Sequence, residues 1–337
     1  MKIGLISHPA CLSHAKWTHH PERPARLEAV IAGVEDAPGE LVRIAAPHVD
    51  PADLERVHLP AYIEAIQKFC ESGGGNLDAD TYAIPASWEA ALRAAGAVPA
   101  AVDALESGTI DTAFVAVRPP GHHALAARAM GFCLFNNIVV AAAKLAAEGK
   151  RVAILDFDVH HGNGSQELVG SDPNILYISL HEYPFYPGSG WLDETGGTRE
   201  SAGTVVNVPL PPFSAGDVYR AAFNEVVVPV TERFAPDWLL VSAGYDAHED
   251  DPLADQRLLA ADYQWMTNVM SGVVGPSRTV FVLEGGYDTT ALRSSAKATL
   301  VGLETAPAQL PDIVSPDRAF RALDAVVERA QQLWDLP

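Results

Sequence analysis

Three side chains that can bind a metal alternate along one short stretch of the chain: Asp156, Asp158 and His160. On an extended backbone they would face one side, while the apolar Phe157 and Val159 would face the other. Buried carboxylates without a partner are costly, and no Lys or Arg stands between or directly beside these residues. A bound cation would remove that cost, whereas the alternative is a salt-bridge cluster at a strand end.

A further carboxylate, Asp246, follows another apolar run, and Gly244 just before it should permit a tight turn that aims the carboxylate over the sheet edge. One imidazole and two carboxylates suit Zn²⁺, and three protein ligands with an open position are typical of catalytic zinc. We therefore predict Asp158, His160 and Asp246 as the zinc ligands. His248 is interpreted as a nearby polar group and not as a ligand.

Two adjacent histidines, His122 and His123, follow a rigid Pro-Pro-Gly turn after a third apolar run. A lone His is often structural, but a pair in this position favours a functional role. One imidazole can take a proton from water activated by zinc, and the same or the other can protonate a leaving amine.

Tyr287 follows the last apolar run and two glycines, Gly285 and Gly286, which free the backbone to approach a ligand closely. Its hydroxyl could donate to a carbonyl oxygen and so stabilise an oxyanion. The alternative is a buried aromatic side chain after a turn.

A regular framework has to position these groups. Strands are predicted at Ile3–Ile6, Thr112–Val117, Arg151–Phe157, Ile175–Leu180, Thr204–Val208, Trp238–Ser242 and Thr279–Leu283. Helices are predicted at Pro24–Val34, Ala86–Glu106, Ile138–Glu148, Val218–Arg233, Leu258–Val273 and Thr289–Leu303. This alternation predicts a single α/β domain over residues 1–337, with a mostly parallel sheet covered by helices on both faces. Ligands of such sheets lie beyond the carboxyl ends of the strands, where the residues above are found.

The composition limits the partners. The 337 residues are 48% apolar, and 23 Lys+Arg against 43 Asp+Glu give a formal charge of −20. This charge disfavours nucleic acid and anionic membranes and would attract cationic substrates, although acidity can also serve solubility alone. The three cysteines, Cys11, Cys70 and Cys133, form no CxxC motif, and their odd number suits a reducing compartment. We find no leader and no apolar stretch of membrane-spanning length, so we expect a cytoplasmic location.

The sequence resembles the histone deacetylase and acetylpolyamine amidohydrolase family, within the arginase-like fold group. The resemblance covers nearly the whole chain and rests on the strings His20–Leu27, Arg118–His123, Met130–Asn137, Asp156–Gly164 and Glu284–Tyr287. Within the motif His161–Gly164, the Asn at position 163 resembles the residue of the class II branch of the family and of its bacterial relatives. The family implies a sheet of about eight strands.

The resemblance implies the same three zinc ligands and gives roles to their neighbours. His123 would be the principal base and acid, and the buried Asp156 would orient His122. In class I relatives the partner of the second His is an Asp, whereas this chain has Asn163, which should make His123 less basic. Tyr287 would be the oxyanion donor.

The resemblance also implies substrate contacts. Phe132 and Tyr186 would form the walls of a narrow tunnel for the lysine methylenes, with Gly131 beside Phe132. Leu253 would lie at the tunnel mouth. Asp80 would rim the pocket and hold a substrate backbone N–H.

Two further features follow from the resemblance alone. Arg26 matches a residue that lines an inner channel for acetate. A K⁺ ion would be bound beside the zinc, through backbone carbonyls and the side chains of Asp156 and Ser179.

Two other classes of protein fit less well. Arginase-like enzymes bind two Mn²⁺ and need Asp-x-His-x-Asp, but Gly162 occupies the fifth position here, which removes one ligand of the second metal. A non-catalytic binding module should have lost a ligand or the tyrosine, and all of these groups are present.

The sequence leaves two substrates as alternatives: acetyl-lysine in a peptide or protein, and an acetylated polyamine. The apolar Leu253 and the short segment between Ile66 and Trp88 favour an open mouth that admits a peptide. An acidic loop beside the site could instead attract a polyamine or be solvated; its carboxylates are Glu249, Asp250, Asp251 and Asp255.

Overall fold

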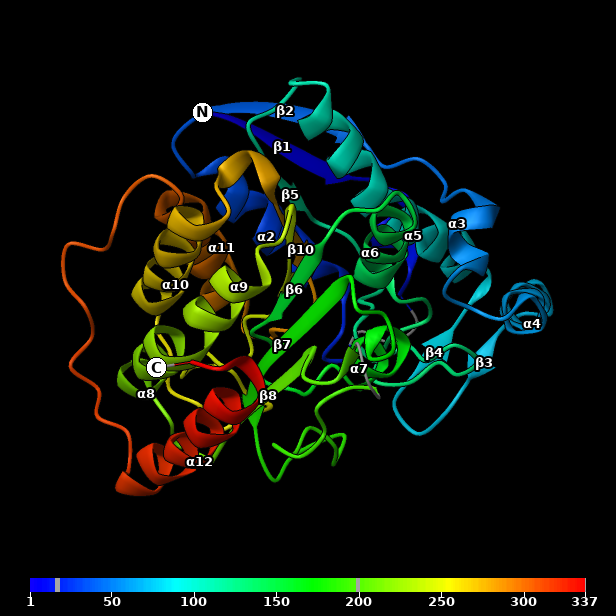
Figure 1. The fold of residues 1–337 in the computed structure, drawn as a ribbon. Helices are drawn as coiled ribbons and strands as arrows, with labels where there is room; N and C mark the ends of the chain where they lie inside the picture. Colours follow the sequence, from blue (N-terminus) through cyan, green and yellow to red (C-terminus); the bar gives the residue numbers. More distant parts are fainter. Residues whose placement is uncertain (16–18, 198–200, 337) are drawn as a thin grey trace.

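The computed structural model describes residues 1–15, 19–197 and 201–336, and an eight-stranded sheet runs through its centre (Figure 1). In chain order its strands are β1 (Lys2–Ser7), β2 (Glu40–Ala45), β5 (Thr112–Val115), β6 (Val152–Asp156), β7 (Ile175–Glu182), β8 (Val205–Leu210), β9 (Trp238–Ala243) and β10 (Thr279–Leu283). Their spatial order is β2-β1-β5-β10-β9-β6-β7-β8, and every neighbouring pair is parallel. A separate antiparallel pair joins β3 (Gly75–Asn76) and β4 (Tyr82–Ala83).

Helices cover both faces of the sheet. Those of the first half are α1 (Ala10–Ser13), α2 (Pro24–Glu35), α3 (Pro51–Glu55), α4 (Pro60–Glu71), α5 (Pro85–Glu106), α6 (Asn137–Ala147) and α7 (Asn163–Val169). Those of the second half are α8 (Gly216–Ala222), the π-helical turn Phe223–Val227, α9 (Val228–Phe234), α10 (Ala260–Val273), the 3₁₀ turn Pro276–Arg278, α11 (Thr289–Gly302) and α12 (Asp317–Trp334). In Figure 1, α9, α10 and α11 lie on one side of the central strands, and α5, α6 and α7 lie on the other.

The predicted α/β class and the single parallel sheet are confirmed. The central strands are buried along their whole length, as the all-apolar run of β6 before Asp156 shows, because a parallel sheet is covered on both faces. The sequence did not indicate β2, an edge strand whose residues are half-buried or exposed. β6 ends at Asp156, so Asp158 and His160 do not continue an extended strand as predicted but lie on the turn that follows.

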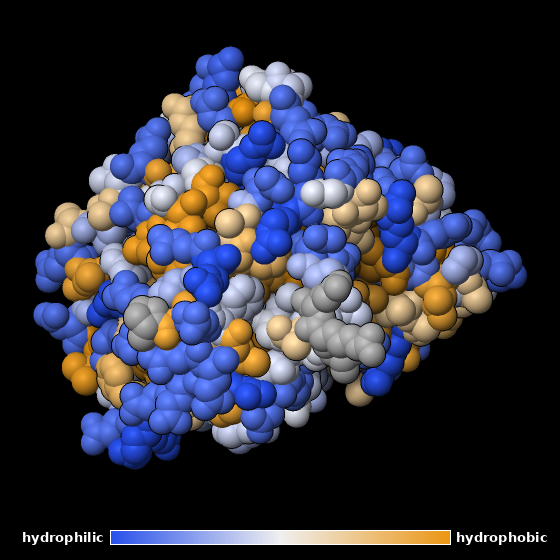
Figure 2. Space-filling model, in the orientation of Figure 1, coloured by the Kyte–Doolittle hydropathy of each residue, from blue (hydrophilic) through white to orange (hydrophobic). Residues whose placement is uncertain are grey.

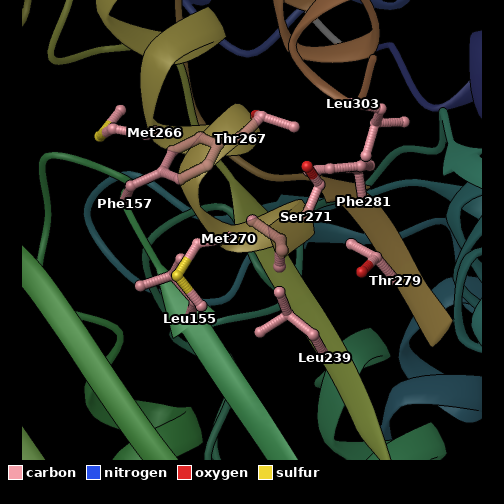
Figure 3. A pocket seen from close by; sticks show the side chains of 11 residues that line it. Leu155, Phe157, Leu239, Met266, Thr267, Met270, Ser271, Thr279, Phe281 and Leu303 are labelled. Carbon is pink, nitrogen blue, oxygen red and sulfur yellow. The ribbon is translucent and has the colours of Figure 1, made fainter. Parts of the chain in front are cut away.

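Side chains fill the space between α10 and the sheet almost completely. A cavity of about 10 Å³ remains between α10 and strands β6, β9 and β10. Figure 3 shows its lining, which is mostly aliphatic, aromatic and thioether side chains. A volume of this size is at the lower limit for a single water molecule, so this cavity offers no binding site for a larger ligand.

The outer surface differs from this core. Hydrophilic side chains cover most of the face drawn in Figure 2, with small hydrophobic areas between them. Within the described part of the chain, no helix has both the length and the apolar character needed to cross a membrane.

Candidate metal centre and surrounding cavity

Four neighbouring strands in the middle of the sheet, β5, β10, β9 and β6, direct the candidate site. Because the strands are parallel, their carboxyl ends meet at one edge, and the segments that follow them converge there. β6 leads to Asp158 and His160, β9 to Asp246, β5 to His122 and His123, and β10 to Tyr287. Residues that are far apart in sequence are therefore brought to one place by the strand order.

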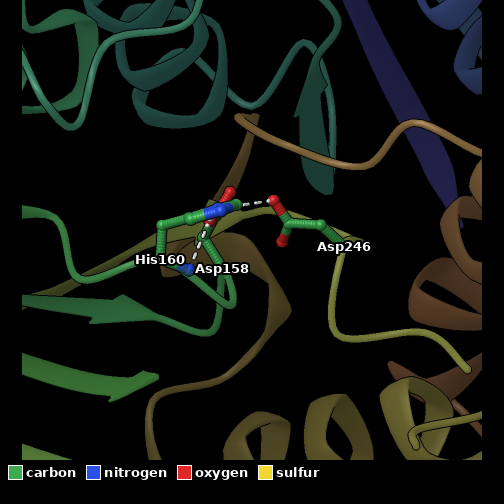
Figure 4. Close-up of side chains that lie close together, drawn as sticks. All are labelled: Asp158, His160 and Asp246. Atoms are coloured by element: carbon green, nitrogen blue, oxygen red, sulfur yellow. Dashed lines mark hydrogen bonds and ion pairs between the residues drawn. The ribbon is translucent and has the colours of Figure 1, made fainter. Parts of the chain in front are cut away.

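The three predicted metal ligands lie together at this edge. Figure 4 shows the imidazole of His160 between the carboxylates of Asp158 and Asp246. Its Nδ1 lies 3.2 Å from Oδ1 of Asp158 and 3.1 Å from Oδ2 of Asp246. One potential ligand atom from each residue lies within 4.8 Å of the others, a spacing that one ion can bridge.

Backbone amides fix the orientation of both carboxylates. Val159 N–H donates to Oδ1 of Asp246 over 2.9 Å, and Gly285 N–H donates to Oδ2 of Asp158 over 2.7 Å. Gly244 is required for space and not for the turn we predicted, since it has no positive φ and a Cβ there would lie 2.0 Å from Oδ2 of Asp158.

The electrostatics of the three residues fit a cation. Both carboxylates are fully buried, and no Lys or Arg of the described chain forms an ion pair with either of them. Burial opposes a charge on His160, but its hydrogen bonds to Asp158 and Asp246 outweigh this and raise its pKa to about 10. The pocket therefore favours positive charge at this position, and the mixed nitrogen and oxygen donors suit Zn²⁺.

The structure gives no room for an additional carboxylate at position 162. A Cβ on Gly162 would lie 2.3 Å from Oδ2 of Asp156 and 2.5 Å from the Tyr177 hydroxyl. A side chain that could bind a second metal is therefore excluded there by sterics as well as by sequence.

The two adjacent histidines have different partners. Nδ1 of His122 lies 3.1 Å from Oδ2 of Asp156, and Nδ1 of His123 lies 2.8 Å from Oδ1 of Asn163. Burial lowers the pKa of His122, but the charges of Asp158 and Asp156 outweigh it and raise that pKa to about 10. Burial lowers the pKa of His123 well below its usual value, and the neighbouring histidines lower it further. The pKa values of the two imidazoles are therefore shifted in opposite directions.

Tyr287 lies in the same cavity and is supported from behind by Arg26. The guanidinium carbon of Arg26 lies 4.8 Å from the centre of the Tyr287 ring. Arg26 is fully buried and donates to the backbone carbonyls of Gly286 and Glu284, so it holds the segment before the tyrosine. Burial raises the pKa of Tyr287 well above its usual value, so its hydroxyl keeps its proton.

A cavity of about 170 Å³ joins these groups to the surface. The substrate-contact residues expected from the sequence all line it: Asp80, Gly131, Phe132, Tyr186 and Leu253. The catalytic and metal candidates in the lining are His122, His123, His160 and Tyr287. The candidate catalytic groups and two aromatic rings, Phe132 and Tyr186, therefore share one cavity.

A hydrogen bond and contacts between aromatic rings position the walls of the cavity. The Phe132 backbone has φ +69°, which is strained for a bulky residue, and its N–H donates to the Thr81 hydroxyl over 3.0 Å. The rings of Phe132 and Tyr287 lie 6.0 Å apart, and those of Tyr186 and His123 lie 5.2 Å apart. Strained backbone at a cavity wall is typical of a functional site.

The acidic loop divides into two parts. Glu249, Asp250 and Asp255 are exposed and do not line the cavity. Asp251 is buried, and its carboxylate accepts N–H groups from Tyr287 over 2.6 Å and from Leu253 over 3.0 Å. The sequence did not distinguish Asp251 from its neighbours, since nothing local indicates that it turns inward.

The remaining predicted residues lie outside the cavity lining. Asp156 and Ser179 are register partners on β6 and β7, and the Ser179 hydroxyl lies 2.9 Å from Nδ1 of His181. Asn163 begins α7 behind His123. Arg26 contacts the Tyr287 ring but does not reach the cavity wall.

Comparison with known proteins agrees with this geometry. A family model described as the histone deacetylase domain matches residues 20–303. The chain is 39% identical over 293 residues to the histone deacetylase-like amidohydrolase of Pseudomonas aeruginosa, covering 84% of this chain and 75% of that protein. It is 33% identical over 339 residues to a probable deacetylase of Archaeoglobus fulgidus, covering 97% and 94%. The crystal structure of the HDA15 HD domain superposes with a TM-score of 0.91 at 34% identity, over 99% of this chain and 95% of that one. The chain therefore belongs to the histone deacetylase family and is a hydrolase of the deacetylase type.

Proposed function

We propose that this chain is a zinc-dependent deacylase that hydrolyses the N-acetyl amide of acetyl-lysine in peptides or proteins. The observation that carries the proposal is that His160, which forms a group with Asp158 and Asp246, lines the same cavity as His123 and Tyr287. Zinc held by the first three residues would polarise the amide carbonyl and lower the pKa of water.

The protein groups supply the proton transfers. Nδ1 of His123 faces Asn163, which leaves Nε2 as the atom that accepts a proton from the attacking water. A low pKa keeps this imidazole neutral and able to act as a base. The proton is then given to the leaving amine by His123 or by His122, which Asp156 orients.

Tyr287 supplies the remaining stabilisation. Its raised pKa keeps the hydroxyl protonated, so it can donate to the oxyanion as the carbonyl carbon becomes tetrahedral. Arg26 and Asp251 hold the backbone and ring of this tyrosine in place before the substrate arrives.

The lining of the cavity supports acetyl-lysine as the substrate. Phe132 and Tyr186 present aromatic surfaces that suit a chain of methylenes, and Leu253 is apolar. Asp80 brings the only carboxylate among the lining residues and would accept a substrate backbone N–H. The alternative substrate is an acetylated polyamine, which the exposed carboxylates of Glu249, Asp250 and Asp255 would attract.

Three further proposals concern a potassium site, the extent of the domain and the location of the protein. A K⁺ ion would bind near Asp156 and Ser179, which occupy matching positions on adjacent strands. Residues 1–337 would form one catalytic domain, because α12, beyond the matched region, packs against β8 and α8. We also propose a cytoplasmic location, to which the three free and buried cysteines are suited.

The decisive experiment compares steady-state hydrolysis of an acetyl-lysine peptide and an N-acetylated polyamine, each with and without a zinc chelator. We expect chelator-sensitive turnover with a higher kcat/KM for the peptide. A preference for the polyamine would assign specificity to the exposed acidic residues instead. Hydrolysis of neither amide would contradict the proposed acetyl-lysine activity.

A further inference from the structure

Glu284 is a fully buried carboxylate to which the proposed reaction gives no role. It lies just after β10, three residues before Tyr287. Its Oε2 accepts the backbone N–H of Gly121 over 2.7 Å and that of His122 over 3.1 Å. Its Oε1 lies 3.5 Å from the Ser242 hydroxyl. The side chain thus connects the end of β10 to the turn that follows β5.

A charged carboxylate is energetically unfavourable at the buried position of Glu284. Burial raises the pKa of Glu284 to about 7, although the charge of His122 and the two N–H donors oppose the shift. No Lys or Arg in the described ranges forms an ion pair with it. An apolar side chain of similar size would fill the space without this cost, so packing alone does not account for a Glu here.

Other side chains hold neighbouring parts of the turn, as the Asn137 side-chain amide does at the Pro119 carbonyl, but the two amides at its end are bound by Glu284. Residues 116–122 lie outside helices and strands, and Pro119 and Pro120 carry no N–H. The N–H groups of Gly121 and His122 are buried, and unpaired buried amides are unfavourable. The carboxylate of Glu284 is the acceptor that the structure provides for both.

The same strand end also carries Tyr287. β5 and β10 are paired neighbours, with Phe114 opposite Phe281. The histidines follow β5 and the tyrosine follows β10, so a contact between the two strand ends sets their relative position.

We propose that Glu284 is a positioning residue, whose carboxylate fixes the backbone of Gly121 and His122 and thereby places the two histidines relative to Tyr287. The inference rests on the proposed deacylase function, since it concerns groups assigned to that reaction. It acts through the reach and acceptor geometry of the side chain and does not require its charge.

Two conservative substitutions separate reach from charge. Glu284→Gln keeps the length and one carbonyl oxygen, which can accept both N–H groups. Glu284→Asp keeps the charge but is one methylene shorter, which draws the acceptor away from the turn.

With an acetyl-lysine peptide as substrate, we expect Glu284→Asp to lower kcat by roughly 10- to 100-fold, because small displacements of catalytic groups have effects of this size. KM and bound zinc should stay close to wild type, and Glu284→Gln should keep kcat within about threefold. Equal activity of wild type and Glu284→Asp, or an equal loss in both variants, would overturn the proposal.

Amide hydrogen exchange gives a second readout that does not depend on turnover. In a peptide covering residues 119–123, the prolines contribute no amide, so exchange reports Gly121, His122 and His123. We expect faster exchange in Glu284→Asp than in wild type, and wild-type exchange in Glu284→Gln. If the wild type hydrolyses no acetyl-lysine peptide, the deacylase proposal fails while this comparison still decides the positioning role. Unchanged exchange in Glu284→Asp would contradict that role.

Discussion

Asn163 lies directly behind His123, with its side-chain Oδ1 2.8 Å from the imidazole Nδ1. The adjacent His122 instead meets a carboxylate, Oδ2 of Asp156, at 3.1 Å. A neutral partner does not stabilise the charged form of an imidazole as a carboxylate does, and the two pKa values lie on opposite sides of the usual one. This difference supports His123, and not His122, as the base.

Replacing Asn163 with Asp should therefore change the pH dependence of the reaction. The new carboxylate would stabilise the protonated form of His123 and raise its pKa, by about one unit for a near charge. Since the base acts when neutral, the rising limb of kcat/KM against pH should move to higher pH. Asn163→Ala provides the control, because it adds no charge and should give no upward shift. A limb that stays in place in Asn163→Asp would count against His123 as the base.

Removing the Tyr287 hydroxyl should slow the chemical step. We expect Tyr287→Phe to lower kcat by roughly 10²–10³, the usual effect of losing one oxyanion donor, with zinc content unchanged. Tyr219→Phe is a matched control, because Tyr219 is also buried and its hydroxyl has no hydrogen-bond partner among the described residues. Kinetics on an acetyl-lysine peptide would measure both. Full activity of Tyr287→Phe would exclude the proposed role.

Buried neutral histidines should make the fold less stable in mild acid. His58 accepts the Asn136 N–H over 2.9 Å, and burial lowers its pKa from 6.5 to about 4. Between these values the unfolded chain binds a proton that the folded chain does not, so stability is present above pH 6.5 and falls as the pH drops towards 4. The loss from this residue between pH 7 and pH 5 should be about 2 kcal/mol.

Denaturant unfolding of wild type and His58→Gln at pH 7 and pH 5 measures this loss. The variant should lose about 2 kcal/mol less than wild type between the two pH values, whatever its stability at pH 7. Comparing each protein with itself at two pH values cancels the cost of the substitution at neutral pH. Identical pH dependence of the two proteins would show that His58 is not held neutral.

The parallel sheet could be predicted because its central strands carry a simple signal. All the predicted strands occur, since strands such as β6 and β9 are apolar throughout and lie between helical patterns. β2 gave no such signal, because an edge strand is half exposed and mixes polar with apolar residues. α12 was also not predicted, although its buried residues Leu323, Val326 and Ala330 recur at helical spacing.

The candidate site shows a similar division. Asp158, His160 and Asp246 could be chosen from residue type and from their place after strands. The supporting contacts could not, because they join a side chain to a distant backbone, as Glu284 to Gly121 and Asp251 to Tyr287 do. Sequence pattern shows which side chains can do chemistry, but not which buried carboxylates hold distant backbone amides.

The central claim is that one zinc ion at Asp158, His160 and Asp246 supports hydrolysis of acetyl-lysine. It is tested most directly by stripping the protein of metal and adding zinc stepwise, with bound zinc and peptide hydrolysis measured in the same samples. We predict that activity returns with one zinc per chain and that Asp246→Ala shows neither tight binding nor activity. His248→Gln is the matched control, because His248 lies two residues further on and outside the three-residue group, so it should bind one zinc per chain. Unchanged zinc stoichiometry in Asp246→Ala, or full hydrolysis by the metal-free protein, would contradict the account.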